Sequence, residues 1–514
     1  MKVIDFFCGS GGFSEGFRQA GFDVIWAVDN WQPAVDTHRE NHSGSNTILD
    51  DVIRLSKLPD KEFEKIIPDS EIIIGSPPCI AFSNSNKSGK GDKTKGIELF
   101  EAFLRIIFRK KYKKNSILKY WILENVPNLK SHINDEYSGK ELGINSKKSL
   151  KINNGNAGIY NAKYYSVPSN RKRFFCGVFP TPVKTIENDD ELIHLSFILD
   201  SLGIPKENLD SVIIDPNYSN YSMVSKEVTD HHYIREVAEH EWKKAKRLKQ
   251  DKGYMGRMSF PENEEKPSRT VMATISFSAR ESMILGYKEN RFRAPTIREI
   301  ASLMSFPIDY RFYGKSKSMK YKLVGNAVPP KLSFAFAKAI ALKENLKFNS
   351  DYIPINHPEK IDFINLSLNS FHLNVEKPKK ETAKFKYHIP YLIINTIRVE
   401  LTNYHSDFEN KKYKWIVEIH KSQGPRAETL KPLINNQQFT KREINNIDNF
   451  IHSIKSKTVS FNKFQKYYCM TKNIRDGRSP IPEKEITSKI MSKMKGKNTK
   501  PEIKLRQEMW KIGL

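Results

Sequence analysis

The sequence predicts an α/β protein whose core is a mostly parallel sheet flanked by helices. Its start, VIDFFCGSGGFSEGFRQAGFDVIWAVD, is typical of a strand, a glycine-rich turn, a helix that Gly21 ends, and a second strand that ends at Asp29. This pattern is half of a nucleotide-binding βαβ unit. Residues 72–74 form a β-branched run bounded by Gly75, which is typical of a buried parallel strand.

The glycine-rich turn is a candidate ligand site. Gly9, Gly11 and Gly12 let backbone amides approach a ligand, and the following helix adds the positive end of its dipole. Asp29, about 20 residues downstream, can accept hydrogen bonds from ribose hydroxyls. The spacing differs from GxGxxG and does not indicate a dinucleotide fold, and a plain turn remains the alternative.

Cys79 follows the buried strand in the loop SPPC. Open α/β sheets bind ligands at the carboxyl ends of their strands, and Pro77 and Pro78 stiffen the loop that brings the thiol there. A thiol fixed at this edge can act as a nucleophile, although a free cysteine is often only a small buried hydrophobe. The polar, glycine-containing segment at 82–96 suits a substrate-contacting lid or a plain surface loop, and a helix is predicted at 97–111.

Three more charged side chains are predicted near this edge. A strand at 120–123 delivers Glu124 to the same edge as Cys79 if the sheet is parallel, although an ordinary strand-end acid fits the pattern as well. Arg171 and Arg173 precede an apolar strand. Alternate residues of an extended chain share a face, so both guanidinium groups can point into one site, and a surface pair is the alternative.

Length and composition indicate a soluble protein of about three domains, with 514 residues of which 38% are hydrophobic. No stretch approaches the roughly 18 apolar residues of a membrane span, and the start MKVIDFF lacks a signal peptide, so we expect a cytoplasmic protein without membrane contact. Cys8, Cys79, Cys176 and Cys469 lie far apart without a CxxC pair, which indicates reduced thiols and neither a zinc site nor a disulfide framework.

The charge balance favours a polyanionic partner. The chain has 85 Lys and Arg against 59 Asp and Glu, a formal net charge of +26. An excess of this size favours nucleic acid, although lysines can also form a merely solvated face.

Taken in order, these motifs resemble those of the DNA cytosine-5 methyltransferases. The resemblance covers about residues 1–345 and rests on DFFCGSGGF, GSPPC, ENVP, NRKR, PTIREIASLMSFP and GNAVPP. It implies a Rossmann-like methyltransferase sheet that GNAVPP completes, S-adenosylmethionine as cofactor, double-stranded DNA as partner, and a monomer with a cognate restriction endonuclease. One departure is Ser169, where the family's arginine pair usually follows glutamine, and it puts local loop packing in doubt.

The resemblance also implies a role for each matching residue. The catalytic residues would be the nucleophile Cys79, with Glu124 and Arg173 gripping the target cytosine and Arg171 behind them. The residues around the cofactor would be Phe7, Gly9, Gly11, Gly12, Asp29 at the ribose, Asp51 near the adenine, Pro78, and Asn326 near the methionine end.

The implied reaction fits the chemistry of cytosine. Carbon 5 is too poor a nucleophile to take a methyl group, so the Cys79 thiolate must first add to carbon 6. Glu124 at N3 spreads the developing charge, and Arg173 holds the O2 edge. The cytosine must leave the duplex stack to be reached.

The resemblance and a change of composition after about residue 346 together divide the chain into four regions. Residues 1–180 and 291–345 would form the catalytic domain, and 181–290 the target-recognition region, with a basic helix in HEWKKAKRLKQDKGYMGR and strands in KPSRTVMATISFSARESMIL. Residues 346–485 would form a lysine-rich α+β accessory domain of unknown role. Its two predicted strand segments contain His388 and His420, which we expect to be ordinary strand residues.

The tail, 486–514, resembles the opening of the very-short-patch repair endonucleases through KGKNTKPEIKLR. That family's catalytic acid and metal site would lie beyond Leu514, so we expect the start of a truncated endonuclease-like domain. The residues alone also fit a basic amphipathic helix.

Two other functions are alternatives. One is the same chemistry on RNA, against which the long region at 181–290 and the C-terminal module argue. The other is a non-catalytic DNA-binding scaffold, against which the intact Cys79, Glu124 and Arg173 argue.

Overall fold

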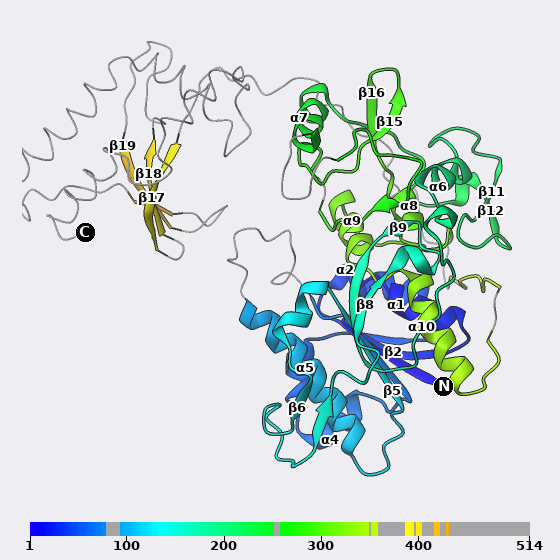
Figure 1. Ribbon diagram of the computed structural model, residues 1–514, viewed down its shortest axis with the longest axis vertical. Coiled ribbons are helices and arrows are strands. Elements are labelled where there is room, and N and C mark those ends of the chain that lie inside the picture. Colours follow the sequence, from blue (N-terminus) through cyan, green and yellow to red (C-terminus); the bar gives the residue numbers. More distant parts are fainter. Residues whose placement is uncertain are drawn as a thin grey trace, which may run out of the picture. The chain divides into compact units, whose positions relative to one another are not determined.

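A computed structural model describes residues 1–78, 93–250, 258–274, 276–348, 351–357, 386–394, 397–402, 416–421 and 428–430. Cys79, Cys469, most of the predicted lid at 82–96 and the tail at 486–514 lie outside these ranges. The chain divides into two compact units, Met1–Val375 and Glu376–Leu514 (Figure 1). Among the described helices, none is both long and apolar enough to span a bilayer.

The first unit is built on a seven-stranded sheet in the order β3-β2-β1-β4-β5-β10-β8. Its strands are β1 (Lys2–Phe6), β2 (Asp23–Asp29), β3 (Asn46–Leu49), β4 (Ile72–Gly75), β5 (Tyr120–Asn125), β8 (Gly158–Asn161) and β10 (Lys172–Val178). β1 to β5 are parallel, whereas β10 is antiparallel to both β5 and β8. The predicted mostly parallel sheet is confirmed.

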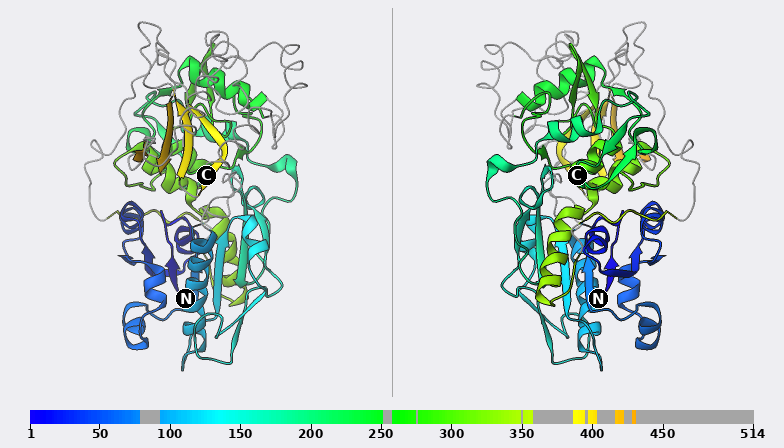
Figure 2. Two further views of the ribbon diagram at one scale, coloured as in Figure 1. Left: turned by 90° about the vertical axis from the view of Figure 1, so that its left-hand side faces the viewer. Right: turned by 90° about the vertical axis from the view of Figure 1, so that its right-hand side faces the viewer.

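Helices cover both faces of the sheet (Figure 2). They are α1 (Gly12–Gln19) and α10 (Pro330–Lys343) on one face, and α3 (Val52–Ser56), α4 (Asp60–Ile66) and α5 (Lys93–Tyr112) on the other, with α2 (Gln32–Asn41) between β2 and β3. Alternation along the strands decides the faces: Val3 packs with α1 and α10, whereas Ile4 and Phe6 pack with α5.

The GNAVPP segment does not complete the sheet, contrary to the prediction. It links α9 (Lys317–Asn326) to α10. Pro329 and Pro330 lack the N–H groups that a ladder needs, and Pro330 instead begins a helix. α10 crosses α1 so closely at Gly16 that a Cβ there would lie 2.4 Å from the Phe334 nitrogen.

The described residues of 195–303, which run past the predicted end of the target-recognition region at 290, form a lobe of short elements beside the sheet (Figures 1 and 2). They are α6 (Leu195–Leu202), β11 (Val212–Ile214), β12 (Ser222–Val224), β13 (Arg235–Glu236), α7 (Glu239–Gln250), β14 (Ser268–Arg269), β15 (Leu285–Lys288), β16 (Arg291–Ala294) and α8 (Ile297–Leu303). The basic helix is confirmed as α7. The segment 266–285, predicted as strands, holds only β14 and the first residue of β15 among its described residues.

Three short strands complete the unit. β6 (Glu136–Ser138) pairs with β7 (Ser149–Lys151), and β9 (Ser169–Asn170) pairs with β14. The β9–β14 pair joins the recognition region to the chain just before β10.

The second unit contains a four-stranded antiparallel sheet. Its strands are β17 (Lys386–Ile394), β18 (Ile397–Thr402), β19 (Ile416–Lys421) and β20 (Glu428–Leu430). The first of the two predicted strands is instead the β17–β18 hairpin, whereas the second corresponds to β19. His388 and His420 lie in strands, as expected. The boundary differs from the predicted one at 346, because residues 351–357 pack on the first unit.

Candidate active site at the carboxyl edge of the sheet

The strand order reverses at β1: β2 and β3 lie on one side of it, and β4 and β5 on the other. β1 pairs with β2 on one side and with β4 on the other, and Phe6 lies opposite Gly75. The loops after β1 and β4 therefore leave the sheet side by side, at the crevice where open α/β sheets bind ligands. The glycine-rich turn and the loop to Cys79 meet at this edge. Pro78, the last described residue before Cys79, is exposed.

The three glycines of the turn have different roles. Among the described residues, only the Phe7 carbonyl would lie near a Cβ on Gly9, at 3.9 Å, and φ of Gly9 is 55°. A Cβ on Gly11 would lie 2.5 Å from the Tyr310 hydroxyl, and one on Gly12 2.2 Å from the Val328 carbonyl. Of the three glycines, Gly9 alone has open space beside it in the described part of the chain, whereas Gly11 and Gly12 permit close packing of the chain on itself.

Asp29 is fixed at the end of β2. Its carboxylate accepts hydrogen bonds from the Gly9 amide and the Trp31 amide, both at 2.9 Å. Burial raises the pKa of this carboxyl. Asp51 differs, because it is exposed and caps α3 by accepting a 2.7 Å hydrogen bond from the Ile53 amide.

Glu124 lies in β5, next to the loop that leads to Cys79. β4 and β5 are parallel, so the condition for bringing Glu124 to this edge is met. The carboxylate is buried and pairs with Arg173, whose Nε is 2.9 Å from Oε1, while the Ser76 hydroxyl donates to Oε2. Asn125 donates a 2.9 Å hydrogen bond to the Pro77 carbonyl. Two successive residues of β5, Glu124 and Asn125, thus form hydrogen bonds with the loop that leads to Cys79.

Arg171 does not share this environment with Arg173. Its guanidinium is buried and donates to the carbonyls of Val271 (3.1 Å), Gly325 (2.9 Å) and Ala327 (3.0 Å). The expected alternation fails because β9 ends at Asn170 and β10 begins at Lys172, so Arg171 lies in the break between them.

Arg171 instead holds the two carbonyls on either side of Asn326. Asn326 is exposed at the end of α9. Through Val271, the same guanidinium connects this segment to the lobe that contains α7.

Sequence reasoning missed several residues of the site. Ser76 and Asn125 lie inside the motifs GSPPC and ENVP, so their membership of these motifs could have identified them. Tyr310, whose hydroxyl donates to the Ser10 carbonyl, had no signal because 300 residues separate the two. In the described part of the chain, no group of three or more His, Cys, Asp and Glu residues is arranged to hold a metal ion.

Residues 1–342 match the family described as C-5 cytosine-specific DNA methylase. The type II methyltransferase M1.HphI of Haemophilus parahaemolyticus is 30% identical over 361 residues, which cover 67% of this chain and 87% of that protein. M.MthTI of Methanothermobacter thermautotrophicus is 28% identical over 66% of this chain and 97% of its own. Among solved structures, the Dnmt2 methyltransferase of S. pombe aligns with 67% of this chain and 100% of its own, at 17% identity and a TM-score of 0.44.

Proposed function

The chain belongs to the C-5 cytosine-specific DNA methylase family, and from this premise we propose that it methylates a flipped-out cytosine through a covalent Cys79 adduct, with S-adenosylmethionine as donor. The observation that supports this mechanism best is the parallel pairing of β4 and β5. It joins the loop that leads to Cys79 to a buried carboxylate and a guanidinium, the two groups that a cytosine ring requires.

The described residues fit the cofactor. The free space at Gly9 leaves room for a ligand beside the turn, and the two amides on Asp29 hold its carboxylate where it can accept from ribose hydroxyls. When bound, S-adenosylmethionine supplies an electrophilic methyl group. The remaining residues that would hold it are Phe7, Gly11, Gly12, Asp51, Pro78 and Asn326.

The chain's own residues act on the base. The Cys79 thiolate adds to carbon 6 of cytosine, which gives carbon 5 the electron density it lacks in the free base. In its protonated form Glu124 donates to N3 or transfers its proton there, and Arg173 binds O2, so both stabilise the charge that the addition creates. Once carbon 5 has taken up the methyl group, loss of its proton expels the thiolate and restores the ring. Arg171 acts as a positioning residue, since its guanidinium donates to the backbone carbonyls of Val271, Gly325 and Ala327.

The partner is double-stranded DNA in this proposal. The net charge of +26 provides the phosphate grip, and the lobe that contains α7 would read the sequence. Because the relatives are type II methyltransferases by name, we further propose that the chain is the modification partner of a restriction endonuclease. The monomeric state, the cytoplasmic location and the repair-endonuclease resemblance of the tail stay predictions.

A trapping experiment tests the covalent step. Random-sequence DNA is made with 5-fluorocytosine in place of cytosine and incubated with the full chain and S-adenosylmethionine. Fluorine cannot leave as the proton does, so the adduct should persist on a denaturing gel. Cys79→Ala should give no adduct, whereas Cys176→Ala, which changes a buried thiol in β10, should still give one. An adduct with Cys79→Ala would refute the assignment of the nucleophile.

A further inference from the structure

Residues 351–357, which we call the strap, follow the family-matched part of the chain and belong to the first unit. The match ends at 342, so the family resemblance gives no role to the strap. It holds two parts of the molecule that both lead to the glycine-rich turn.

The first anchor is α1. The Ile353 amide donates to Gln19 Oε1 at 2.9 Å, and the Ile353 carbonyl accepts from Gln19 Nε2 at 3.1 Å and from Arg18 Nη2 at 2.8 Å. One backbone residue of the strap therefore binds the last two residues of the helix that starts at the turn.

The second anchor is Asp309. The Tyr352 hydroxyl donates to one of its carboxylate oxygens, and the Ile355 amide donates to the other at 3.0 Å. His357 Nε2 lies 3.0 Å from the Asp309 carbonyl. The Tyr352 ring also packs against Tyr218, with ring centroids 4.7 Å apart.

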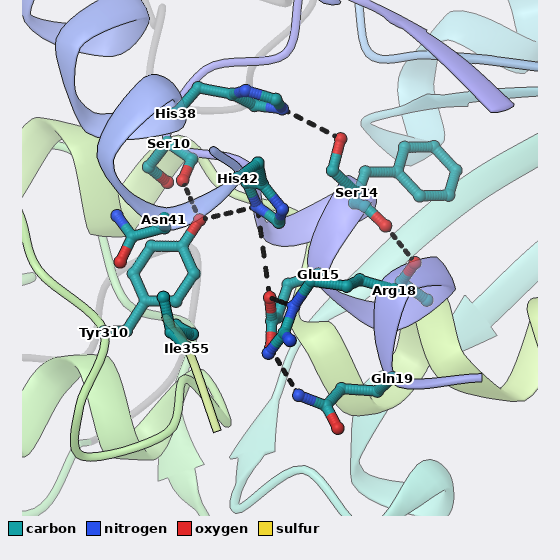
Figure 3. Close-up of polar contacts among 12 residues, drawn as sticks. Ser10, Ser14, Glu15, Arg18, Gln19, His38, Asn41, His42, Tyr310 and Ile355 are labelled. Carbon is teal, nitrogen blue, oxygen red and sulfur yellow. Dashed lines mark hydrogen bonds and ion pairs between the residues drawn. The ribbon is translucent and has the colours of Figure 1, made fainter. Parts of the chain in front are cut away.

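A buried polar network connects α1 to the turn (Figure 3). Arg18 makes two 2.9 Å hydrogen bonds to Glu15, and Gln19 adds one of 2.7 Å to the same fully buried carboxylate. His42 Nε2 is 3.9 Å from Glu15 Oε2 and 3.2 Å from the Tyr310 hydroxyl oxygen.

Tyr310 is the end of this network and also the neighbour of the second anchor. Its hydroxyl donates to the Ser10 carbonyl and occupies the space that a Cβ on Gly11 would need. The network and Asp309 therefore both contact or adjoin Tyr310, which packs against the glycine-rich turn.

We infer that the strap is a positioning element of the cofactor site, which fixes Arg18, Gln19 and Asp309 and thereby holds Tyr310 against the glycine-rich turn. Glu15 is a buried charge that depends on Arg18, and Arg18 in turn is oriented by the Ile353 carbonyl. Its neighbour Asp309 sets the position of Tyr310 through the backbone. This inference rests on the proposed function, because the turn is assigned to S-adenosylmethionine there.

The test compares two tyrosine variants in the full chain. Tyr352→Phe removes the hydroxyl that binds Asp309, and Tyr120→Phe removes a hydroxyl that donates to Glu344 at 2.7 Å, away from the network. Each loses one hydrogen bond to a carboxylate, so the pair is matched in chemistry. Two quantities are measured: the Kd for S-adenosylmethionine by calorimetry, and amide hydrogen exchange of the peptide covering 7–13 without cofactor.

Tyr352→Phe should raise the Kd about three- to tenfold and speed exchange in the turn, whereas Tyr120→Phe should stay within about twofold of the wild type in both. Equal values for the two variants would overturn the inference. If the wild type does not bind S-adenosylmethionine, the proposed cofactor fails, yet the exchange comparison still decides the role of the strap.

A second variant separates positioning from mere stability. Gln19→Met keeps the size of the side chain but removes its hydrogen bonds to Ile353 and Glu15. It should raise the KM for S-adenosylmethionine more than it lowers kcat, together with faster exchange at 7–13. A lowered Tm with unchanged KM and exchange would show a structural clamp only, and would contradict the inference.

Discussion

Replacing Arg171 by Lys tests whether this arginine works through the backbone. The guanidinium donates to three buried carbonyls, at Val271, Gly325 and Ala327. A lysine ammonium is a single point on a flexible stem and cannot reproduce the fork. If two of the three contacts are lost, at about 1.5–3 kcal/mol for each hydrogen bond to a charged group, the cost is about 3–6 kcal/mol. That is a large part of the roughly 5–15 kcal/mol that stabilises a protein.

The assay is thermal unfolding of the full chain, with Arg54→Lys as the matched control. Arg54 is half-exposed and pairs with Asp50, so its replacement should cost less than about 1 kcal/mol. We expect Arg171→Lys to lower the Tm of the first unit by about 5–10 °C, and the control to leave it nearly unchanged. Equal Tm values for the two variants would refute the claim that the hydrogen bonds of Arg171 stabilise the segment around Asn326.

Three further predictions concern single side chains. Glu124→Gln keeps the shape but cannot transfer a proton to N3, so methyl transfer from labelled S-adenosylmethionine should fall about 10²- to 10⁴-fold, and a rate within fivefold would contradict its role. Burial raises the pKa of the Asp5 carboxyl to about 8, so on raising the pH the unfolded chain loses this proton before the folded chain does. The stability of the fold should therefore fall as pH rises from about 4 to 8. Asp5→Asn should remove this part of the decline in Tm, and parallel plots of Tm against pH for the variant and the wild type would contradict the prediction. Gly12→Ala places a Cβ 2.2 Å from a carbonyl and should lower the Tm more than Gly9→Ala, which faces free space, while the reverse order would contradict the roles given to these glycines.

Local patterns in the sequence were sufficient for the elements that position the site. The strand, turn and helix before Asp29 were predicted because β-branched runs and glycines mark their ends, and the structure shows β1, α1 and β2 there. The approach of Glu124 to the Cys79 loop required only that β4 and β5 be parallel. That condition is confirmed.

Contacts between distant segments could not be predicted. The strap binds α1 across more than 330 residues of sequence, and Arg171 binds carbonyls 100 to 156 residues away. The role of Gly12 likewise depends on Val328, which a local pattern does not reveal. The GNAVPP prediction was wrong because two adjacent prolines favour the start of a helix over a ladder.

The central claim is best tested by mapping 5-methylcytosine in plasmid DNA from cells that express the full chain. Bisulfite or nanopore reads from the wild type are compared with those from Cys79→Ala. The account predicts one short sequence motif methylated at carbon 5 of cytosine in the wild type and no methylation with Cys79→Ala. Methylation that survives in the variant, or its absence from the wild type, would contradict it.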